Sequence, residues 1–209
     1  MLKRIAVLIS GGGSNLQSLI DNIHRADCPQ TIVCVLADRP AYGLERAKAA
    51  GIPAHLIERK VLSAGEFQRR IEKALEEAGA EVIVLAGYLS ILPPELVERY
   101  RNRIVNIHPS LIPSFCGMGY YGHKVHEGVL AYGCKVSGAT VHLVDEGADT
   151  GPILLQKTVP VLDDDTADAL AARVLEVEHQ LLPAGVRLLC QDRLCVEGRR
   201  VRILPQPEV

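Results

Sequence analysis

Short apolar runs alternate with segments of helical period along most of the chain. The runs Ile5–Ile9 and Val82–Ala86 contain no polar side chain, which is typical of strands buried on both faces of a parallel sheet. After the first run, Leu16, Leu19 and Ile23 recur at the spacing of an amphipathic helix. This pattern predicts strands at 5–9, 31–37, 54–57, 82–86, 103–107, 136–144 and 153–159, and helices at 16–23, 44–50, 67–75, 122–132 and 166–182.

Two further sequence signals predict the start of a helix and the position of a β-hairpin. Ser63 and Glu66 have the spacing of a capping box at the start of the third predicted helix. Residues 194–204 form two short apolar runs around Glu197-Gly198, which predicts a hairpin near the carboxyl terminus.

The order of these elements predicts an α/β fold. Strands that alternate with helices favour a single open, mostly parallel twisted sheet with helices on both faces, a Rossmann-like arrangement, followed here by a C-terminal antiparallel hairpin. Ligands of such sheets bind outside the carboxyl ends of the strands. Because no internal repeat or linker interrupts the pattern, we expect one domain over residues 1–209.

Composition narrows the class of protein. The chain is 48% hydrophobic and 23% charged, with a formal net charge of −2, and no basic run suggests nucleic acid as a partner. The first apolar run is too short for a signal sequence or a membrane span, so we expect a cytoplasmic protein without a membrane partner. The six cysteines show no C-x-x-C pair, and disulfides are not expected in that compartment.

A glycine loop, Ser10-Gly11-Gly12-Gly13-Ser14-Asn15, joins the first predicted strand to the first helix. Glycines there let the backbone approach an anion, and the helix amino terminus offers N–H groups and a favourable dipole. The loop lacks the Gly-Lys-Ser/Thr of a P-loop, and Leu16 replaces the third glycine of a dinucleotide fingerprint. A monophosphate site fits best. Asp38, at the end of the second strand, keeps a dinucleotide site open, and a tight structural turn is the plainer alternative.

Asn106 and His108 lie at the carboxyl end of a predicted strand, and Asp149 follows in a later loop. An amide and an imidazolium are suited to stabilise the oxyanion that forms when an amine attacks a formyl carbon. We expect Asp149 to lie close enough to favour the charged imidazole and to relay the proton of the amine. The alternatives are a structural histidine and a solvated acidic turn.

Other chemistry is less well supported. His123 and His126 share a helix face, but no third ligand stands at a telling distance, so no metal is predicted. His142 alternates with apolar residues in a strand and is either structural or a support for the catalytic side chains. The chain contains no G-x-S-x-G sequence, the motif that would indicate a serine hydrolase.

Taken together, these motifs make the chain resemble the phosphoribosylglycinamide formyltransferases, folate-dependent enzymes of purine synthesis, over nearly its whole length. The Asn-x-His-Pro-Ser-Leu motif with a distant aspartate is shared by wider formyltransferases, whereas the glycine loop is the more specific mark. The matching segments are 7–16, 43–47, 85–88, 106–113, 140–142, 149–153 and Glu178-His179.

The resemblance implies formyl transfer from 10-formyltetrahydrofolate, as co-substrate, to the amine of phosphoribosylglycinamide. It implies three groups of residues. The catalytic group is Asn106, His108 and Asp149. The group that would bind the ribonucleotide is Gly12, Gly13, Ser14, Asn15 and Glu178. The group that would bind the folate is Leu89, Ser90, Ile91, Leu92, Asn106, Val144, Asp145 and Asp149. His142 would support the catalytic side chains.

Three positions depart from the family's usual residues. Arginine is usual where Ser90 and Ala64 stand, and lysine or glutamine is frequent where Leu175 stands. Each difference removes a long polar side chain from a substrate site. Arg59 and Lys60 are placed to compensate for Ala64.

Several alternatives stay open. A formyltetrahydrofolate deformylase would carry an added segment before the catalytic domain, and a methionyl-tRNA formyltransferase a basic domain after it. A sugar-nucleotide formyltransferase usually lacks the glycine loop. A non-catalytic nucleotide- or folate-binding module would keep the fold without turnover. The sequence leaves a monomer and a homodimer equally open.

Overall fold

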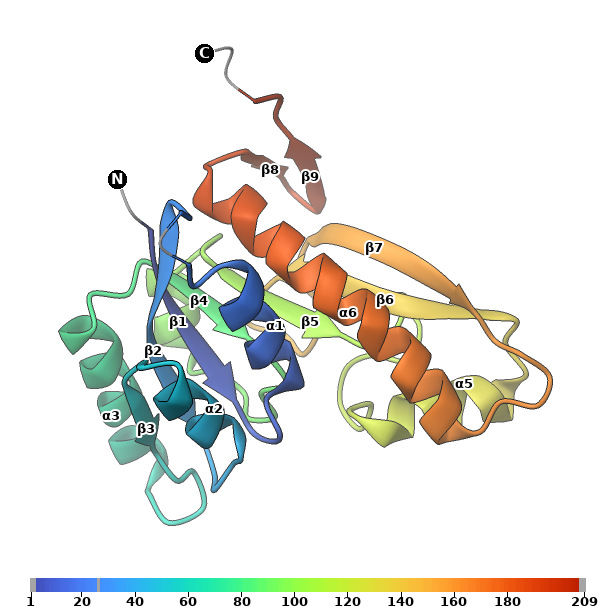
Figure 1. Cartoon of the computed structure of the whole chain (residues 1–209), viewed down its shortest axis with the longest axis horizontal. Coiled ribbons are helices and arrows are strands. Elements are labelled where there is room, and N and C mark those ends of the chain that lie inside the picture. The colour runs from blue at the N-terminus through green and yellow to red at the C-terminus, as the bar shows by residue number, and fades with distance from the viewer. Residues whose placement is uncertain (1–2, 26, 207–209) are drawn as a thin grey trace. The chain divides into compact units, whose positions relative to one another are not determined.

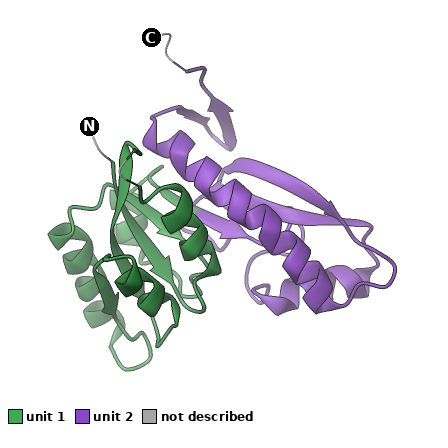
Figure 2. Cartoon of the chain, viewed as in Figure 1, with its two compact units in different colours: residues 1–105 green, residues 106–209 purple. Residues whose placement is uncertain are grey.

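The first half of the chain forms a parallel sheet around β1 (Lys3–Ile9). In the computed structural model, which describes residues 3–25 and 27–206, β1 pairs in parallel with β2 (Gln30–Ala37) and β4 (Val82–Leu85). The short β3 (Ala54–Leu56) pairs in parallel with β2, which gives the order β3-β2-β1-β4. Residues 5–9 are at most 1% exposed, as the unbroken apolar run predicted. These elements belong to a compact unit of residues 1–105 (Figure 2).

Four helices accompany this sheet: α1 (Ser14–Asn22), α2 (Gly43–Ala49), α3 (Ala64–Glu77) and α4 (Pro94–Arg99). Half of the predicted capping box is present, because the Ser63 hydroxyl accepts the Glu66 N–H at 3.3 Å. The Glu66 carboxylate instead pairs with Arg69 and Arg70. The sequence pattern missed α4 because its six residues bury only Leu96 and Val97, too few to show a period.

Residues 106–209 form a second compact unit, and β5 (Ile104–His108) crosses the boundary between the two (Figure 2). Here β6 (Val136–Leu143) and β7 (Ile153–Pro160) are antiparallel. The predicted hairpin is confirmed as β8 (Leu194–Glu197) and β9 (Arg200–Ile203), and β9 adds in parallel to β7.

Helix α6 (Ala167–Cys190) packs on β6 and β7 and contacts α5 (His123–Tyr132) (Figure 1). The predicted end at residue 182 is wrong, because the helix continues through Pro183 for another two turns. Proline removes one backbone hydrogen bond, but the buried side chains continue beyond it with Val186 and Leu189. Burial of this apolar face outweighs the lost bond.

The predicted fold class is confirmed: the chain has an open, mostly parallel sheet with helices and a C-terminal antiparallel pair. Among the described residues, every helix is too short or too polar to span a lipid bilayer. The single domain over residues 1–209 stays a prediction.

Candidate active site

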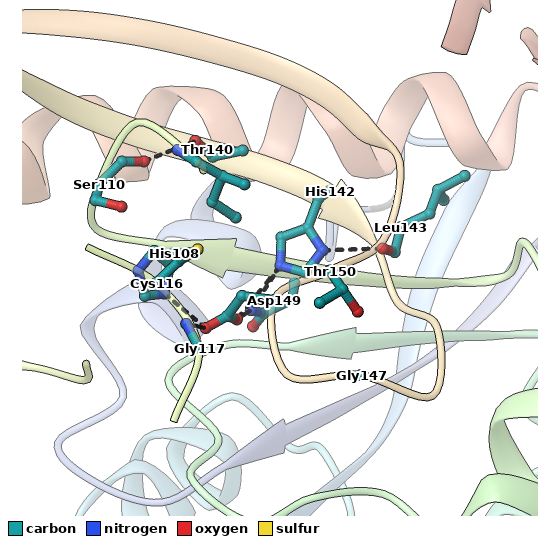
Figure 3. A network of polar contacts seen from close by, with 12 residues as sticks. His108, Ser110, Cys116, Gly117, Thr140, His142, Leu143, Gly147, Asp149 and Thr150 are labelled. Atoms are coloured by element: carbon teal, nitrogen blue, oxygen red, sulfur yellow. Dashed lines mark hydrogen bonds and ion pairs between the residues drawn. The ribbon is translucent and has the colours of Figure 1, made fainter. Parts of the chain in front are cut away.

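His108 ends β5 and lies beside Asp149 (Figure 3). Both of its ring nitrogens face oxygen atoms. Nε2 lies 2.9 Å from the carbonyl oxygen of Phe115, so this nitrogen carries a proton and donates it. Nδ1 lies 3.5 Å from Oδ2 of Asp149. The predicted proximity of the imidazole and the carboxylate is therefore confirmed.

Asn106 lies two residues before His108 on the same strand, and its amide nitrogen bridges two partners. It donates to Nε2 of His142 at 3.1 Å and to Oδ1 of Asp149 at 3.3 Å. His142 donates from Nδ1 to the carbonyl oxygen of Leu143 at 2.9 Å, which leaves Nε2 as the acceptor in a neutral ring. His142 thus fixes the orientation of the Asn106 amide, and its supporting role in catalysis stays a prediction.

Asp149 is held in a conformation that few residues adopt. Its φ of 56° lies in the left-handed region, and the backbone N–H of Gly117 donates to Oδ2 at 3.0 Å. Strained backbone of this kind concentrates at functional sites. The carboxylate is thus fixed from both sides, by Gly117 and by Asn106.

The loop that carries Asp149 is closed by its own side chains. Oδ1 of Asp145 accepts hydrogen bonds from the Gly147 N–H at 3.1 Å and the Thr150 hydroxyl at 2.5 Å. A Cβ on Gly151 would lie 1.8 Å from the carbonyl oxygen of Leu143, so this position requires glycine. The acidic segment is an ordered loop against β6, and its aspartate side chains serve different tasks.

Burial controls the charges in this cluster. It lowers the pKa of His108, and the opposing effects of Asp149 and the Phe115 carbonyl do not restore it. The expectation that Asp149 keeps this imidazole charged is therefore wrong for the free protein. Burial alone raises the pKa of Asp149, but the charge of His108 and the hydrogen bond from the Gly117 N–H contribute to lowering it. Asp149 is thus a carboxylate at neutral pH.

The glycine loop of the first unit joins β1 to α1, as the sequence predicted. Gly13 has φ 73° at the N-cap of α1, and no side chain caps this helix. A Cβ on Gly13 would lie 2.7 Å from the Cα of Gly43, so the loop packs directly on α2. The Arg46 guanidinium donates from Nε to the carbonyl oxygen of Gly12 at 2.8 Å and fixes the loop.

Asp38 does not act as the ribose-binding acid of a dinucleotide site. Its side chain is fully buried and pairs with Arg39, and the Ser90 hydroxyl donates to it at 2.6 Å. Of the neighbouring folate candidates, Leu89 and Ile91 are exposed and Leu92 is buried.

The remaining predicted contacts divide between the two units. In the second unit Val144 and Asp145 are half-buried beside the cluster in sequence, and Glu178 is buried on α6. Leu175 is half-buried on the same helix, and Ala64 is exposed at the start of α3.

Sequence reasoning missed the turn formed by residues 113–117. Its backbone supplies the Phe115 carbonyl to His108 and the Gly117 N–H to Asp149. The signal was present as three glycines, Gly117, Gly119 and Gly122, all with positive φ. Their spacing after the His-Pro-Ser-Leu motif marks a loop that must bend sharply.

Comparison with known proteins places this site in a family. The family model described as formyl transferase matches residues 3–186. The chain therefore belongs to the formyl transferase family.

More specific similarities follow. The phosphoribosylglycinamide formyltransferase of Haemophilus influenzae is 40% identical over 92% of this chain and 90% of its own length. The chloroplastic phosphoribosylglycinamide formyltransferase of Vigna unguiculata is 42% identical over 92% of this chain, which spans 62% of that relative. The crystal structure of glycinamide ribonucleotide transformylase 1 from Symbiobacterium toebii superposes with a TM-score of 0.91 at 42% identity, covering 98% of this chain and 95% of that one.

Proposed function

We propose that this protein transfers the formyl group of 10-formyltetrahydrofolate to the amine of phosphoribosylglycinamide, a step of de novo purine synthesis. The single observation that carries the proposal is the cluster in which Asn106, His108 and the Gly117 N–H surround the Asp149 carboxylate. Its membership in the formyl transferase family and its relatives named as phosphoribosylglycinamide formyltransferases support the choice of reaction.

The reaction forms one C–N bond and breaks another. The substrate amine attacks the formyl carbon, which gives a tetrahedral oxyanion and a protonated amine. Asp149 is the base that takes the amine proton, directly or through one water, because its lowered pKa keeps it ionised at neutral pH. Collapse of the intermediate breaks the bond to the folate N10, and the proton passes to that nitrogen.

Asn106 and His108 are the donors to the oxyanion in this proposal. Each already has protein acceptors, since the Asn106 amide contacts His142 and Asp149 and Nε2 of His108 contacts Phe115. A donor must therefore exchange its partner for the substrate oxygen. An N–H group preorganised in this way contributes about 10²–10³-fold to the rate of acyl transfer.

The residues that bind the two substrates are assigned according to the groups that the family resemblance implied. We assign the phosphate to the backbone and side chains of Gly12, Gly13, Ser14 and Asn15, where an uncapped helix amino terminus favours an anion. We assign the ribose hydroxyls to Glu178. The folate site in this proposal is formed by the segment 89–92 together with Val144, Asp145, Asn106 and Asp149.

The test is an assay with 10-formyltetrahydrofolate and a panel of acceptors: phosphoribosylglycinamide, glycinamide without the ribose phosphate, and water alone. We expect formylated ribonucleotide with the first acceptor and at least a hundredfold lower rate with the others. Formate release that is equally fast without an amine would instead identify a deformylase. Folate binding without any turnover, unchanged by His108→Ala, would identify a non-catalytic module.

A further inference from the structure

Asp38 is a buried carboxylate that the catalytic cluster does not use. It directly follows β2, and its side chain is 0% exposed. The guanidinium of Arg39 binds both oxygens, with Nε 3.0 Å from Oδ1 and Nη2 2.9 Å from Oδ2. A buried charge is tolerated only with partners of this kind, and breaking such a pair is costly.

Two serine hydroxyls complete the shell of this carboxylate. Ser90 donates to Oδ2 of Asp38 at 2.6 Å, and Ser10 also hydrogen-bonds to the carboxylate. Burial alone raises the pKa of Asp38, but the hydrogen bonds of Arg39, Ser90 and Ser10 outweigh it, and the pKa is lowered. Asp38 is therefore ionised, and its hydrogen bonds with the two hydroxyls are charge-assisted.

Ser10 holds the same segment at two more points. Its Oγ accepts the backbone N–H of Leu89 at 2.8 Å, and its own N–H donates to the carbonyl oxygen of Gly87 at 3.0 Å. Ser10 is 6% exposed and is the first residue of the glycine loop. Residues 87–90 are thus attached at three places to buried groups at the ends of β1 and β2.

Because of these hydrogen bonds, successive side chains of this segment point in opposite directions. The Ser90 hydroxyl points to buried Asp38, whereas its neighbours Leu89 and Ile91 are 47% and 61% exposed. Two large apolar side chains are thereby kept at the surface, where they are available to pack against an apolar ligand surface. The Ser90 hydroxyl is occupied by Asp38, so it is not presented to a ligand.

We propose that Asp38 and Ser90 are positioning residues for the folate-binding segment 89–92: the carboxylate holds the Ser90 hydroxyl and so fixes the backbone that presents Leu89 and Ile91 to the ring system of the co-substrate. The inference rests on the proposed function and deepens it. Ser90 acts on the folate through its hold on the backbone, and not by direct contact.

The test compares Ser90→Ala, Ser90→Thr and Asp38→Asn with a control, Ser137→Ala. Ser137 is a buried serine whose hydroxyl has no hydrogen-bond partner among the residues that the structure describes, so its removal reports the general effect of losing a hydroxyl. The measurements are KM for each substrate, kcat, and the Kd of 5-formyltetrahydrofolate, an unreactive folate used as the probe.

We expect Ser90→Ala to raise the folate KM and the probe Kd about tenfold, the effect of one charge-assisted hydrogen bond. The KM for the ribonucleotide should stay within about twofold, a split that a loss of overall stability would not produce. Ser90→Thr, which keeps the hydroxyl, and Ser137→Ala should match the wild type. Should Asp38→Asn fail to fold, the serine variants carry the test alone.

Different failures are distinguishable. An active wild type whose folate KM and probe Kd are unchanged by Ser90→Ala overturns this inference and leaves the proposed function intact. A wild type that binds the probe without transferring a formyl group contradicts the proposed function, and the Kd comparison then decides the inference. A wild type that does not bind the probe overturns both.

Discussion

The imidazole of His108 and the carboxylate of Asp149, with Nδ1 3.5 Å from Oδ2, are both held by one short turn of backbone. The Phe115 carbonyl accepts from Nε2 of His108, and two residues later the Gly117 N–H donates to Asp149. Phe115 itself has a φ of 49°, in the left-handed region. Residues distant in sequence thus acquire a fixed geometry from main-chain groups that no side-chain motif reveals.

The pH dependence of catalysis follows from the charges of this pair. Because the pKa of Asp149 and the pKa of His108 are both below their ordinary values, Asp149 is a carboxylate and the His108 imidazole is uncharged at neutral pH. We expect kcat to rise with pH through an acidic limb and to level off below about pH 6.5, the ordinary value for histidine. The limb reports the coupled pair and neither residue alone. A limb centred above pH 7 in a kcat profile would contradict this assignment.

His126, buried on α5, makes folding stability depend on pH. Burial first, and then the charges of His123 and His108, lower its pKa to about 4. Between that value and the unfolded value of about 6.5 the unfolded chain binds more protons, so the free energy of unfolding falls as the pH falls. After allowance for solvent screening, we expect the wild type to lose about 1 kcal/mol more than His126→Leu between pH 7 and pH 5. The measurement is urea unfolding of the wild type and His126→Leu at pH 7 and at pH 5. Equal losses of unfolding free energy in the two proteins would refute this prediction.

Gly151 is required for the closure of the Asp149 loop. A methyl group there meets the Leu143 carbonyl oxygen at 1.8 Å, and backbone cannot yield cheaply. We expect Gly151→Ala to lower the free energy of unfolding by about 3 kcal/mol and to reduce kcat as the loop shifts. Gly65→Ala is the control, because its Cβ meets only the flexible Arg69 side chain, at 3.6 Å, within α3. That variant should be stabilised slightly, by about 0.5–1 kcal/mol.

Gly13 tests the phosphate assignment. Gly13→Ala places a side chain at φ 73° and only 2.7 Å from the Cα of Gly43, so the loop must move. We expect the KM for the ribonucleotide to rise at least tenfold while the folate KM stays within about threefold. Gly51→Ala has the same backbone strain, with φ 71° and nothing within 4 Å. If both variants change the ribonucleotide KM equally, the loop is not the phosphate site.

The sequence predicted those features that local patterns encode. The apolar run of β1 and the glycine loop before α1 were predicted from period and composition. The His108–Asp149 contact was inferred from chemistry and resemblance, since spacing along the chain does not define distance in space. The charge of His108 was mistaken, because burial depends on every element packed around it.

Long-range effects account for the other errors. Pro183 is a helix breaker by local rules, yet α6 continues because its buried face continues. The sequence also did not predict that the Ser90 hydroxyl donates to Asp38, 52 residues away in the chain. Neither the helix extension nor this hydrogen bond leaves a signal within a short window of sequence.

The central claim is that Asp149 accepts the proton of the attacking amine beside His108 and Asn106. Its most direct test is a single-turnover measurement on Asp149→Asn with both substrates saturating, together with the Kd of each. We expect the rate of formyl transfer to fall by about 10³-fold, within the range of a lost general base, while both Kd values stay within about threefold. A single-turnover rate within threefold of the wild type would contradict the account.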